Sequence, residues 1–537
     1  MKYRDVIDSI LVAIVAVLSR SLTALPWGVT LGLGTFFGGI AYYLSPNRRR
    51  VGIKNLRNAF GSLYSHEELA RILRKAYQDM GCNVAEIVAM PKVDDTHLRE
   101  HLGVKGDEGF QKIMDQGKGA ILITGHFGNW ELGNHYACAR GFPLTVLARD
   151  QKFERLYSFL NSRRSSRGSV VVSKGMNMRQ LIHNLRGGGL LALLSDQDAG
   201  RNGIWAPLFG TIASVPKGSF VIALRAGAPM VPVFVIREQG TKHRIELEEP
   251  LEVRPGSFDE QVQDLCVQFN QRLEKQVSAN PTQWLWAHKR WKSSPVRRIL
   301  ILDDGKLGHL RQSEAVADMA RGHFINQLGQ RGYDPELIEV RARSVRVEHV
   351  SAGRRKRMLL LSGMALLRPW LSPWLLRTCL TPDTLQALNA DAPDLIVSCG
   401  SATAPLNLLL GNLYGSKCVV VQRAPVFGSK GFDLAILPRH DVVRVRHNEV
   451  AVLGALNALA SHHLDRAAEF WRAQLKLGAG ESCVGLLIGG DSKHCVWDGD
   501  SLPALVSEVL ELSKSLGFKV LLTTSRRTPK GAEQAIR

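Results

Sequence analysis

The sequence lacks the paired cysteines that zinc sites and disulfide scaffolds need. Its 8 cysteines are scattered over 537 residues, and no two of them stand in a C-x-x-C pair. Cys399, Cys418 and Cys483 lie in apolar runs that are typical of buried strands. We therefore expect reduced core thiols in a cytoplasmic protein, with no metal site.

The features of nucleic-acid modules are also missing, although the chain is strongly basic. A net charge of +20 and a pI near 9.8 imply anionic partners. The sequence has neither stripes of aromatic and basic residues nor zinc-ligand spacings. Its basic clusters at 48–50 and 354–357 lie beside apolar segments, a placement typical of contact with an anionic membrane surface. We expect anionic membrane lipids among the partners and no nucleic acid.

No internal repeat and no low-complexity linker divides the chain, yet 537 residues leave room for two or three domains. A Pro/Ser break at 293–295 follows the Trp-rich stretch 280–292, and strand and helix patterns alternate on both sides of it. The segments we expect are a membrane anchor over 1–46, an α/β domain over 47–295, and a doubly wound region with one half over 296–475 and an incomplete second half over 476–537.

The N-terminus has the composition of a membrane anchor. The apolar run 9–19 is too short to span a bilayer, whereas 22–44 offers 23 uncharged residues, and about 20 helical residues cross a hydrocarbon core. Pro26 weakens a simple spanning helix, and Gly34-x-x-x-Gly38 permits close helix packing. The arginines at 48–50 place the following chain in the cytoplasm. Spanning, re-entrant and interfacial placements all stay open.

The segment 120–134 holds a potential base beside a carboxylate. An apolar run ends in Gly125-His126, and Glu131 follows, with Gly125 and Gly128 allowing a sharp turn from strand into helix. On one helix the two side chains would lie about 140° apart. They meet if His126 lies on the turn and Glu131 in the first helical turn. The alternative is a strand-end histidine with a glutamate that the helix dipole favours.

Polar residues follow two more apolar runs of this domain, and ligands of open α/β sheets bind at the carboxyl ends of the strands. Besides His126 after 120–124, these residues are Arg149 and Asp150 after 143–148, and Asp196 and Gln197 after 190–194. A binding site at this edge is therefore predicted.

Four blocks of the first 292 residues resemble the late acyltransferases of lipid A biosynthesis, the lauroyl/myristoyl transferase family within the lysophospholipid acyltransferase group. The blocks are His126-Phe-Gly-Asn-Trp-Glu131; Arg149 with Asn161-Ser-Arg-Arg164 and Gly168; Ser195-Asp-Gln-Asp-Ala-Gly-Arg-Asn-Gly203 continuing to Pro207-Leu-Phe-Gly210; and Ala228-Pro-Met-Val-Pro-Val-Phe234. The resemblance implies an acyltransferase α/β domain at the bacterial inner membrane, facing the cytoplasm.

The resemblance also implies acyl carrier protein as the acyl donor and a lipid A precursor as the acceptor, without a cofactor. An imidazole suits removal of the hydroxyl proton, so His126 is the predicted base and Glu131 the acid that orients it. Arg149 and Arg164 would bind phosphates. Asp196 and Gln197 would bind a sugar hydroxyl or orient Arg149, and Gly203 belongs to the same substrate-binding block. Acylation of a lysophospholipid or glycerophosphate is the alternative.

The second half resembles a different family, named for elongated mitochondria and acting in mitochondrial fission. The blocks are Asp303-Asp-Gly-Lys-Leu-Gly-His309 with Gln312, Ser398-Cys-Gly-Ser-Ala-Thr-Ala-Pro405, Leu487-Ile-Gly-Gly490 and Thr523-Thr-Ser-Arg-Arg-Thr-Pro529. Leu307 stands where the family pattern usually has proline. The resemblance implies a GT-B-like pair of Rossmann-type halves.

Glycine-rich turns of this region are candidates for a diphosphate site at helix N-termini. The candidate residues are Gly305, Gly400, Gly489 and Gly490, with Arg526 or Arg527 to neutralise the charge. Tight α/β turns explain the glycines equally well, and the region is then a membrane-associated binding module without chemistry. The basic, Leu/Trp-rich segment 354–378 is either a membrane-surface element or a cap over a cleft.

Overall fold

The computed structural model describes most of the chain in two compact units, Met1–Asn457 and Ala458–Arg537. The described residues are 3–148, 153–173, 178–367, 371–422, 428–441, 444–457, 461–478, 480–490 and 501–525, with 528, 531 and 534. The predicted boundaries at 46/47, 295/296 and 475/476 stay predictions.

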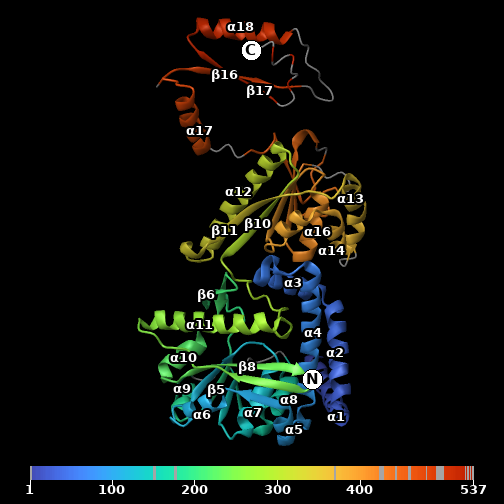
Figure 1. The fold of residues 1–537 in the computed structure, drawn as a ribbon, viewed down its shortest axis with the longest axis vertical. Helices are drawn as coiled ribbons and strands as arrows, with labels where there is room; N and C mark the ends of the chain where they lie inside the picture. The colour runs from blue at the N-terminus through green and yellow to red at the C-terminus, as the bar shows by residue number, and fades with distance from the viewer. Residues whose placement is uncertain are drawn as a thin grey trace. The chain divides into compact units, whose positions relative to one another are not determined.

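Two helices begin the chain, α1 (Tyr3–Ala24) and α2 (Trp27–Leu44) (Figure 1). The run 22–44, in which Pro26 was expected to weaken a simple spanning helix, is divided between the two helices, because Pro26 has no backbone N–H and precedes the first residue of α2. Within the described residues, the helix long and apolar enough to cross a membrane is α1, over Ile7–Ala24, with a mean hydropathy of 1.8. The run 9–19 is thus the middle of a longer helix.

Helix α2 packs closely on α4 (His66–Val88) through small residues. A Cβ atom on Gly34 would lie 2.7 Å from the carbonyl oxygen of Gly81, and Gly38 meets the backbone of Tyr77 in the same way. The predicted close packing through Gly34 and Gly38 is therefore confirmed, with α4 as the partner helix. A capping box formed by Ser65 and Glu68 begins α4.

A seven-stranded sheet organises the first half in the order β1-β9-β8-β2-β5-β3-β4. Its strands are β1 (Leu102–Lys105), β2 (Ala120–Thr124), β3 (Leu144–Ala148), β4 (Val170–Ser173), β5 (Leu190–Leu194), β8 (Met230–Gln239) and β9 (Lys242–Leu247). Neighbouring strands are parallel except for the β8–β9 hairpin. The apolar runs predicted as strands are confirmed, because strands buried on both faces read as continuous apolar stretches.

Helices cover both faces of this sheet (Figure 1). Ile121 and Leu191 face a core with α9 (Met178–Arg186), α10 (Gly218–Ala226) and α11 (Phe258–Ala279). Ala120 and Leu190 face the other core, with α6 (Asp107–Met114) and α7 (Trp130–Ala139). The remaining elements are α3 (Pro46–Phe60), α5 (Asp95–His101), α8 (Glu154–Arg164), β6 (Ile204–Leu208) and β7 (Thr211–Val215).

A second sheet of six parallel strands follows in the order β11-β10-β12-β13-β14-β15. Its strands are β10 (Val296–Asp303), β11 (Glu339–Arg346), β12 (Leu395–Cys399), β13 (Lys417–Val421), β14 (Leu434–Pro438) and β15 (Glu449–Val452). Helix α12 (Leu307–Gln330) packs on one face and α16 (Ala404–Tyr414) on the other. The predicted doubly wound arrangement is confirmed for this half, and the strand order reverses between β10 and β12.

The segment predicted as a membrane element or a cap forms α13 (Ala352–Leu367) and α14 (Leu371–Cys379), before α15 (Pro382–Leu388). Met358, Ala365 and Leu375 are buried in the core, whereas Leu360 is 76% exposed and Trp374 is 41% exposed. Both interpretations of this segment stay hypotheses.

The second unit pairs two parallel strands, β16 (Cys483–Ile488) and β17 (Lys519–Thr524), and contains α17 (Ser461–Gln474) and α18 (Ser501–Ser515). Strand β16 confirms the strand that was expected around Cys483. A GT-B-like architecture for the second half stays a prediction.

Candidate active site

His126 lies in the connection between β2, which ends at Thr124, and α7, which begins at Trp130. Glu131 lies in the first turn of α7, as predicted. Gly125 is needed for close approach, because a Cβ atom there would lie 2.9 Å from Oδ2 of Asp196. The local sequence therefore presents the imidazole at the carboxyl end of the strand.

Asp196 holds His126 through both of its carboxylate oxygens. Its Oδ1 lies 2.7 Å from Nδ1 of His126, and its Oδ2 accepts the backbone N–H of His126 at 2.7 Å. The indole N–H of Trp284 donates to Oδ2 at 2.8 Å. Burial alone would raise the pKa of Asp196, but His126 and these hydrogen bonds lower it to about 2. The carboxylate is therefore ionised and fixed in place.

This pairing sets the chemistry of the imidazole. Because a carboxylate only accepts hydrogen bonds, the neutral ring carries its proton on Nδ1 and leaves Nε2 as the base. The Nε2 atom lies 3.2 Å from the side-chain amide of Gln197, and the His126 side chain is 20% exposed. Burial disfavours the charged ring, but Asp196 and then Glu131 favour it, so the pKa of His126 is raised above its ordinary value.

Glu131 was predicted to orient the imidazole, whereas the hydrogen bond to Nδ1 is made by Asp196. Strands β2 and β5 are paired with Thr124 opposite Leu194, so that His126 and Asp196 both stand two residues beyond a matched strand end. That common offset is the signal that sequence reasoning missed. Glu131 is 4% exposed and lines the same cavity, close enough to raise the pKa of His126.

Of the other residues predicted to bind substrate, the structure describes the surroundings of Gly203 but not the side chains of the two arginines. Arg149 lies outside the described residues, and Arg164 ends α8 with a side chain that is likewise not described. Gly203 follows a 3-10 turn, and a Cβ atom there would lie 2.8 Å from both Ala199 and the backbone of Val215. The structure thus brings together His126, Glu131, Asp196 and Gln197, with Gly203 as a close-packing position near them.

A cavity of about 1260 Å³ opens at His126. Its polar lining near the imidazole includes Glu131, Gln197 and Asp198. The rest is largely apolar, with side chains from the strands and from α7, α8 and α10; examples are Leu122, Phe142, Val146, Phe153, Ile222 and Val235. A base that lines a largely apolar cavity can act on the head of a ligand whose hydrocarbon part is buried.

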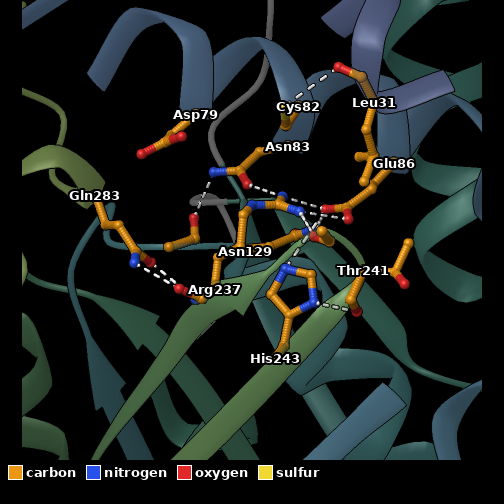
Figure 2. Close-up of polar contacts among 12 residues, drawn as sticks. Leu31, Asp79, Cys82, Asn83, Glu86, Asn129, Arg237, Thr241, His243 and Gln283 are labelled. Atoms are coloured by element: carbon orange, nitrogen blue, oxygen red, sulfur yellow. Dashed lines mark hydrogen bonds and ion pairs between the residues drawn. The ribbon is translucent and has the colours of Figure 1, made fainter. Parts of the chain in front are cut away.

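A buried ion pair fixes the loop that follows His126 (Figure 2). Arg237 of β8 donates to both oxygens of Glu86 on α4, at 2.7 and 2.5 Å. The same guanidinium donates to Oδ1 of Asn83 at 2.7 Å, and Asn83 donates to the carbonyl oxygen of Gly128 at 2.7 Å. Asn129 donates to Glu86 at 2.6 Å. We call Glu86, Arg237, Asn83 and Asn129 the loop clamp.

Gln283 completes the support of this loop. Its side-chain amide exchanges two hydrogen bonds with the backbone of Arg237. Its backbone carbonyl oxygen accepts the N–H of Gly128 at 2.8 Å. Gly128 has a φ of +55°, a conformation that favours glycine. Sequence reasoning missed the loop clamp and Trp284, although Trp284 and Gln283 lie in the Trp-rich stretch that it singled out.

The diphosphate candidates of the second half lie in both units. Gly305 follows β10 and Gly400 follows β12, with φ values of +89° and +76°. Gly489 and Gly490 follow β16 in the second unit, and Arg526 and Arg527 lie outside the described residues. Among the described residues, no group of His, Cys, Asp and Glu is placed to hold a metal ion.

Comparison with known proteins covers both halves of the chain. Residues 2–293 match the family model described as bacterial lipid A biosynthesis acyltransferase, and residues 308–537 match the model described as mitochondrial fission ELM1. The lipid A biosynthesis palmitoleoyltransferase of Escherichia coli is 25% identical over 277 residues, which is 51% of this chain and 88% of that protein. The lauroyltransferase of the same organism is 24% identical over 276 residues, 50% and 88% of the two chains.

A phosphatidylinositol mannoside acyltransferase of Mycolicibacterium smegmatis is 25% identical over 210 residues, 38% of this chain and 67% of that protein. The fold, the imidazole–carboxylate pair and these matches place the first half among the acyltransferases. Because the matched segment exceeds half of the chain, the protein belongs to the bacterial lipid A biosynthesis acyltransferase family. Both predicted resemblances are confirmed.

Proposed function

We propose that this protein transfers a fatty acyl chain from acyl carrier protein to a hydroxyl group of a lipid A precursor. The observation that carries the proposal is the His126–Asp196 pair, whose imidazole lines the largely apolar cavity. The relatives named for palmitoleoyl and lauroyl transfer support the substrate class, and their different names leave the chain length open.

In the proposed reaction, Nε2 of His126 removes the proton of the acceptor hydroxyl. The hydroxyl oxygen attacks the thioester carbonyl carbon, the new C–O ester bond forms, and the C–S bond breaks. The departing thiolate takes the proton from the imidazolium. Asp196 and Glu131 stabilise the transient positive charge on the ring. No covalent acyl-enzyme is required, since the base acts directly on the acceptor.

The cavity would hold the acyl chain. Each methylene group moved from water into an apolar lining contributes about 0.8 kcal/mol. Saturated chains of different length would therefore bind with affinities set by how much of the cavity they fill.

Basic side chains would bind the anionic groups of both substrates. Arg149 and Arg164 are the proposed phosphate ligands, and Gly203 belongs to the same substrate-binding block. The net charge of +20 favours encounter with an acidic carrier protein and with anionic lipids. Helix α1 is the proposed anchor in the bacterial inner membrane, with the catalytic domain on the cytoplasmic side.

The test is acceptor choice by the purified full-length protein. We expect transfer from acyl carrier protein to a lipid A precursor at a rate well above transfer to lysophosphatidate. A preference for lysophosphatidate would favour the alternative, a lysophospholipid or glycerophosphate acyltransferase.

A second function is proposed for the region from residue 296, namely binding of a diphosphate-bearing ligand. The turns at Gly305 and Gly400 favour it, since both follow strands at the reversal point of the second sheet. Gly489, Gly490, Arg526 and Arg527 stay candidates for the same role. Calorimetry with uridine, cytidine and guanosine diphosphates tests it, and absence of binding by folded protein would favour a binding module without chemistry.

A further inference from the structure

A second imidazole–carboxylate pair lies in the second sheet's domain. Asp304 follows β10, and His309 lies in the first turn of α12, with Nδ1 of His309 2.9 Å from Oδ2 of Asp304. The side chains are 20% and 5% exposed for His309 and Asp304, compared with 20% and 4% for His126 and Asp196. Both pairs therefore consist of a buried carboxylate on Nδ1 and a partly exposed ring.

The pair stands where the second sheet reverses its strand order. Strand β10 lies between β11 and β12, and ligands of doubly wound sheets bind outside the carboxyl ends of the strands at such a point. Gly400, directly after β12, touches the ring, since a Cβ atom there would lie 2.8 Å from Cε1 of His309. The connections after two neighbouring strands thus converge on one imidazole.

Further polar groups lie at the same edge of the sheet. The Lys306 ammonium is 3.7 Å from Oδ2 of Asp304, and Arg346 at the end of β11 pairs with Asp303 at 3.2 Å. Gln422, directly after β13, has a φ of +69° although it is not glycine. Such strain costs about 1–3 kcal/mol and is concentrated at functional sites. Every one of these residues follows or ends a strand of the second sheet.

We propose that Asp304 and His309 form a second proton-transfer site, which acts on a ligand activated by a diphosphate group. The inference rests on the diphosphate binding proposed above and assigns the chemistry at that edge of the second sheet. Asp304 fixes the proton of the neutral ring on Nδ1, so Nε2 of His309 is the base.

In the step, a hydroxyl group of water or of an acceptor attacks the carbon atom that carries the diphosphate. Its proton passes to Nε2 of His309, and a new C–O bond forms. The bond between that carbon and the diphosphate oxygen breaks, and its electron pair leaves on the diphosphate. Lys306 and the backbone N–H groups after Gly305 and Gly400 lie at the edge where this negative charge would collect.

The experiment uses full-length protein in detergent micelles. Calorimetry measures binding of uridine, cytidine and guanosine diphosphates, and a coupled assay measures diphosphate release from the same nucleotides linked to hexoses and to N-acetylhexosamines. His309→Asn keeps a hydrogen-bonding amide toward Asp304 but removes the base. His323→Asn is the matched control, because His323 is an exposed histidine on the same helix.

We expect His309→Asn to bind the diphosphate as the unchanged protein does and to slow its release by at least about 10²-fold, whereas His323→Asn changes neither. Acyl transfer measured in the same samples should be unaffected, which separates this site from the one at His126. Failure of the unchanged protein to bind any diphosphate, or equal release by His309→Asn, would overturn the proposal and make the pair a structural feature of the start of α12.

Discussion

Asp196 decides which nitrogen of His126 can accept a proton. The carboxylate is ionised, is 4% exposed and makes three hydrogen bonds to His126 and Trp284, so it cannot turn away without losing them. Glu131 adds a second negative charge near the ring. In the proposed mechanism, the imidazole is thus held as a base and is stabilised when it becomes a cation.

The substitution Asp196→Asn should slow acyl transfer by roughly 10²–10⁴-fold, because the amide no longer fixes the tautomer. It should also change the pH profile. The proposed mechanism requires neutral His126, so the rate should rise as pH increases through the pKa of His126, which Asp196 raises. Removing the negative charge of Asp196 should move the rise of kcat/KM with pH to lower pH.

Steady-state rates of acyl transfer between pH 5 and 9 check this prediction. The control is Asp115→Asn, because Asp115 is an exposed aspartate. A wild-type pH profile in Asp196→Asn would show that Asp196 has no part in proton transfer.

At the scale of elements, the loop clamp joins α4 and the β8–β9 hairpin to the loop after His126. Glu86 and Arg237 are 3% and 10% exposed in their side chains, so the ion pair is nearly dry. Removing one partner of such a pair leaves a buried charge and costs about 3–5 kcal/mol.

We expect Glu86→Gln to lower the free energy of unfolding by a similar amount and to lower kcat more than it raises KM, because the loop that carries His126 is loosened. The matched control is Glu238→Gln on the same hairpin. Its pair with Arg244 is 46% and 41% exposed, so the change should be about 1 kcal/mol or less. Chemical unfolding and steady-state kinetics of both variants test this prediction. Equal losses of stability and of kcat in Glu86→Gln and Glu238→Gln would contradict the role of the loop clamp.

Several strands of both sheets could be predicted from the sequence, because runs such as 120–124 and 395–399 are largely apolar. The strands β1, β9, β11 and β15 were not predicted, because they are short or carry charged residues. Pro26 was expected to weaken a helix over 22–44, but the extension of the apolar run 9–19 into the longer helix α1 was not predicted. The loop clamp could not be predicted, because Glu86, Asn129 and Arg237 come from three distant elements and no local pattern marks them. Asp196 was missed as the partner of His126 for another reason: both residues follow an apolar run by the same offset, but the pairing of β2 with β5 was not predicted.

At the scale of the whole molecule, α3 connects the two sheets of the first unit. Lys54 pairs with Asp394 at 2.7 Å, and Arg50 donates to the backbone of Asn412 at 3.0 Å. Asp394 also accepts the backbone N–H of Arg298 at 2.9 Å. Burial alone would raise the pKa of Asp394, but Lys54 and the backbone hydrogen bond lower it below its ordinary value of 3.8.

Because the folded pKa of Asp394 is lowered, this pair stabilises the fold above the ordinary aspartate pKa, and the contribution is lost as pH falls through the folded value. Lys54→Met should lower the free energy of unfolding by roughly 1.5–3 kcal/mol at neutral pH. Unfolding at pH 7 and at pH 3 checks this. If the difference in unfolding free energy between wild type and Lys54→Met grew toward pH 3, it would contradict a stabilising ion pair between Lys54 and Asp394.

Attachment to the membrane should depend on α1, since Ile10, Ile14 and Val17 are each at least half exposed. Full-length protein should stay with membranes in roughly 1 M salt, where the Debye length is about 3 Å. A form lacking residues 3–24 should be released, and it leaves α2 in place on α4. Release of the full-length protein by salt would mean that charge supplies the attachment.

The central claim is that His126 is the base for acyl transfer. The most direct test is turnover of purified His126→Ala with acyl carrier protein as donor and a lipid A precursor as acceptor, alongside His183→Ala, an exposed histidine on α9. The account predicts a loss of roughly 10²–10⁴-fold in His126→Ala with unchanged folding, and wild-type turnover in His183→Ala. Turnover close to wild type in folded His126→Ala would contradict it.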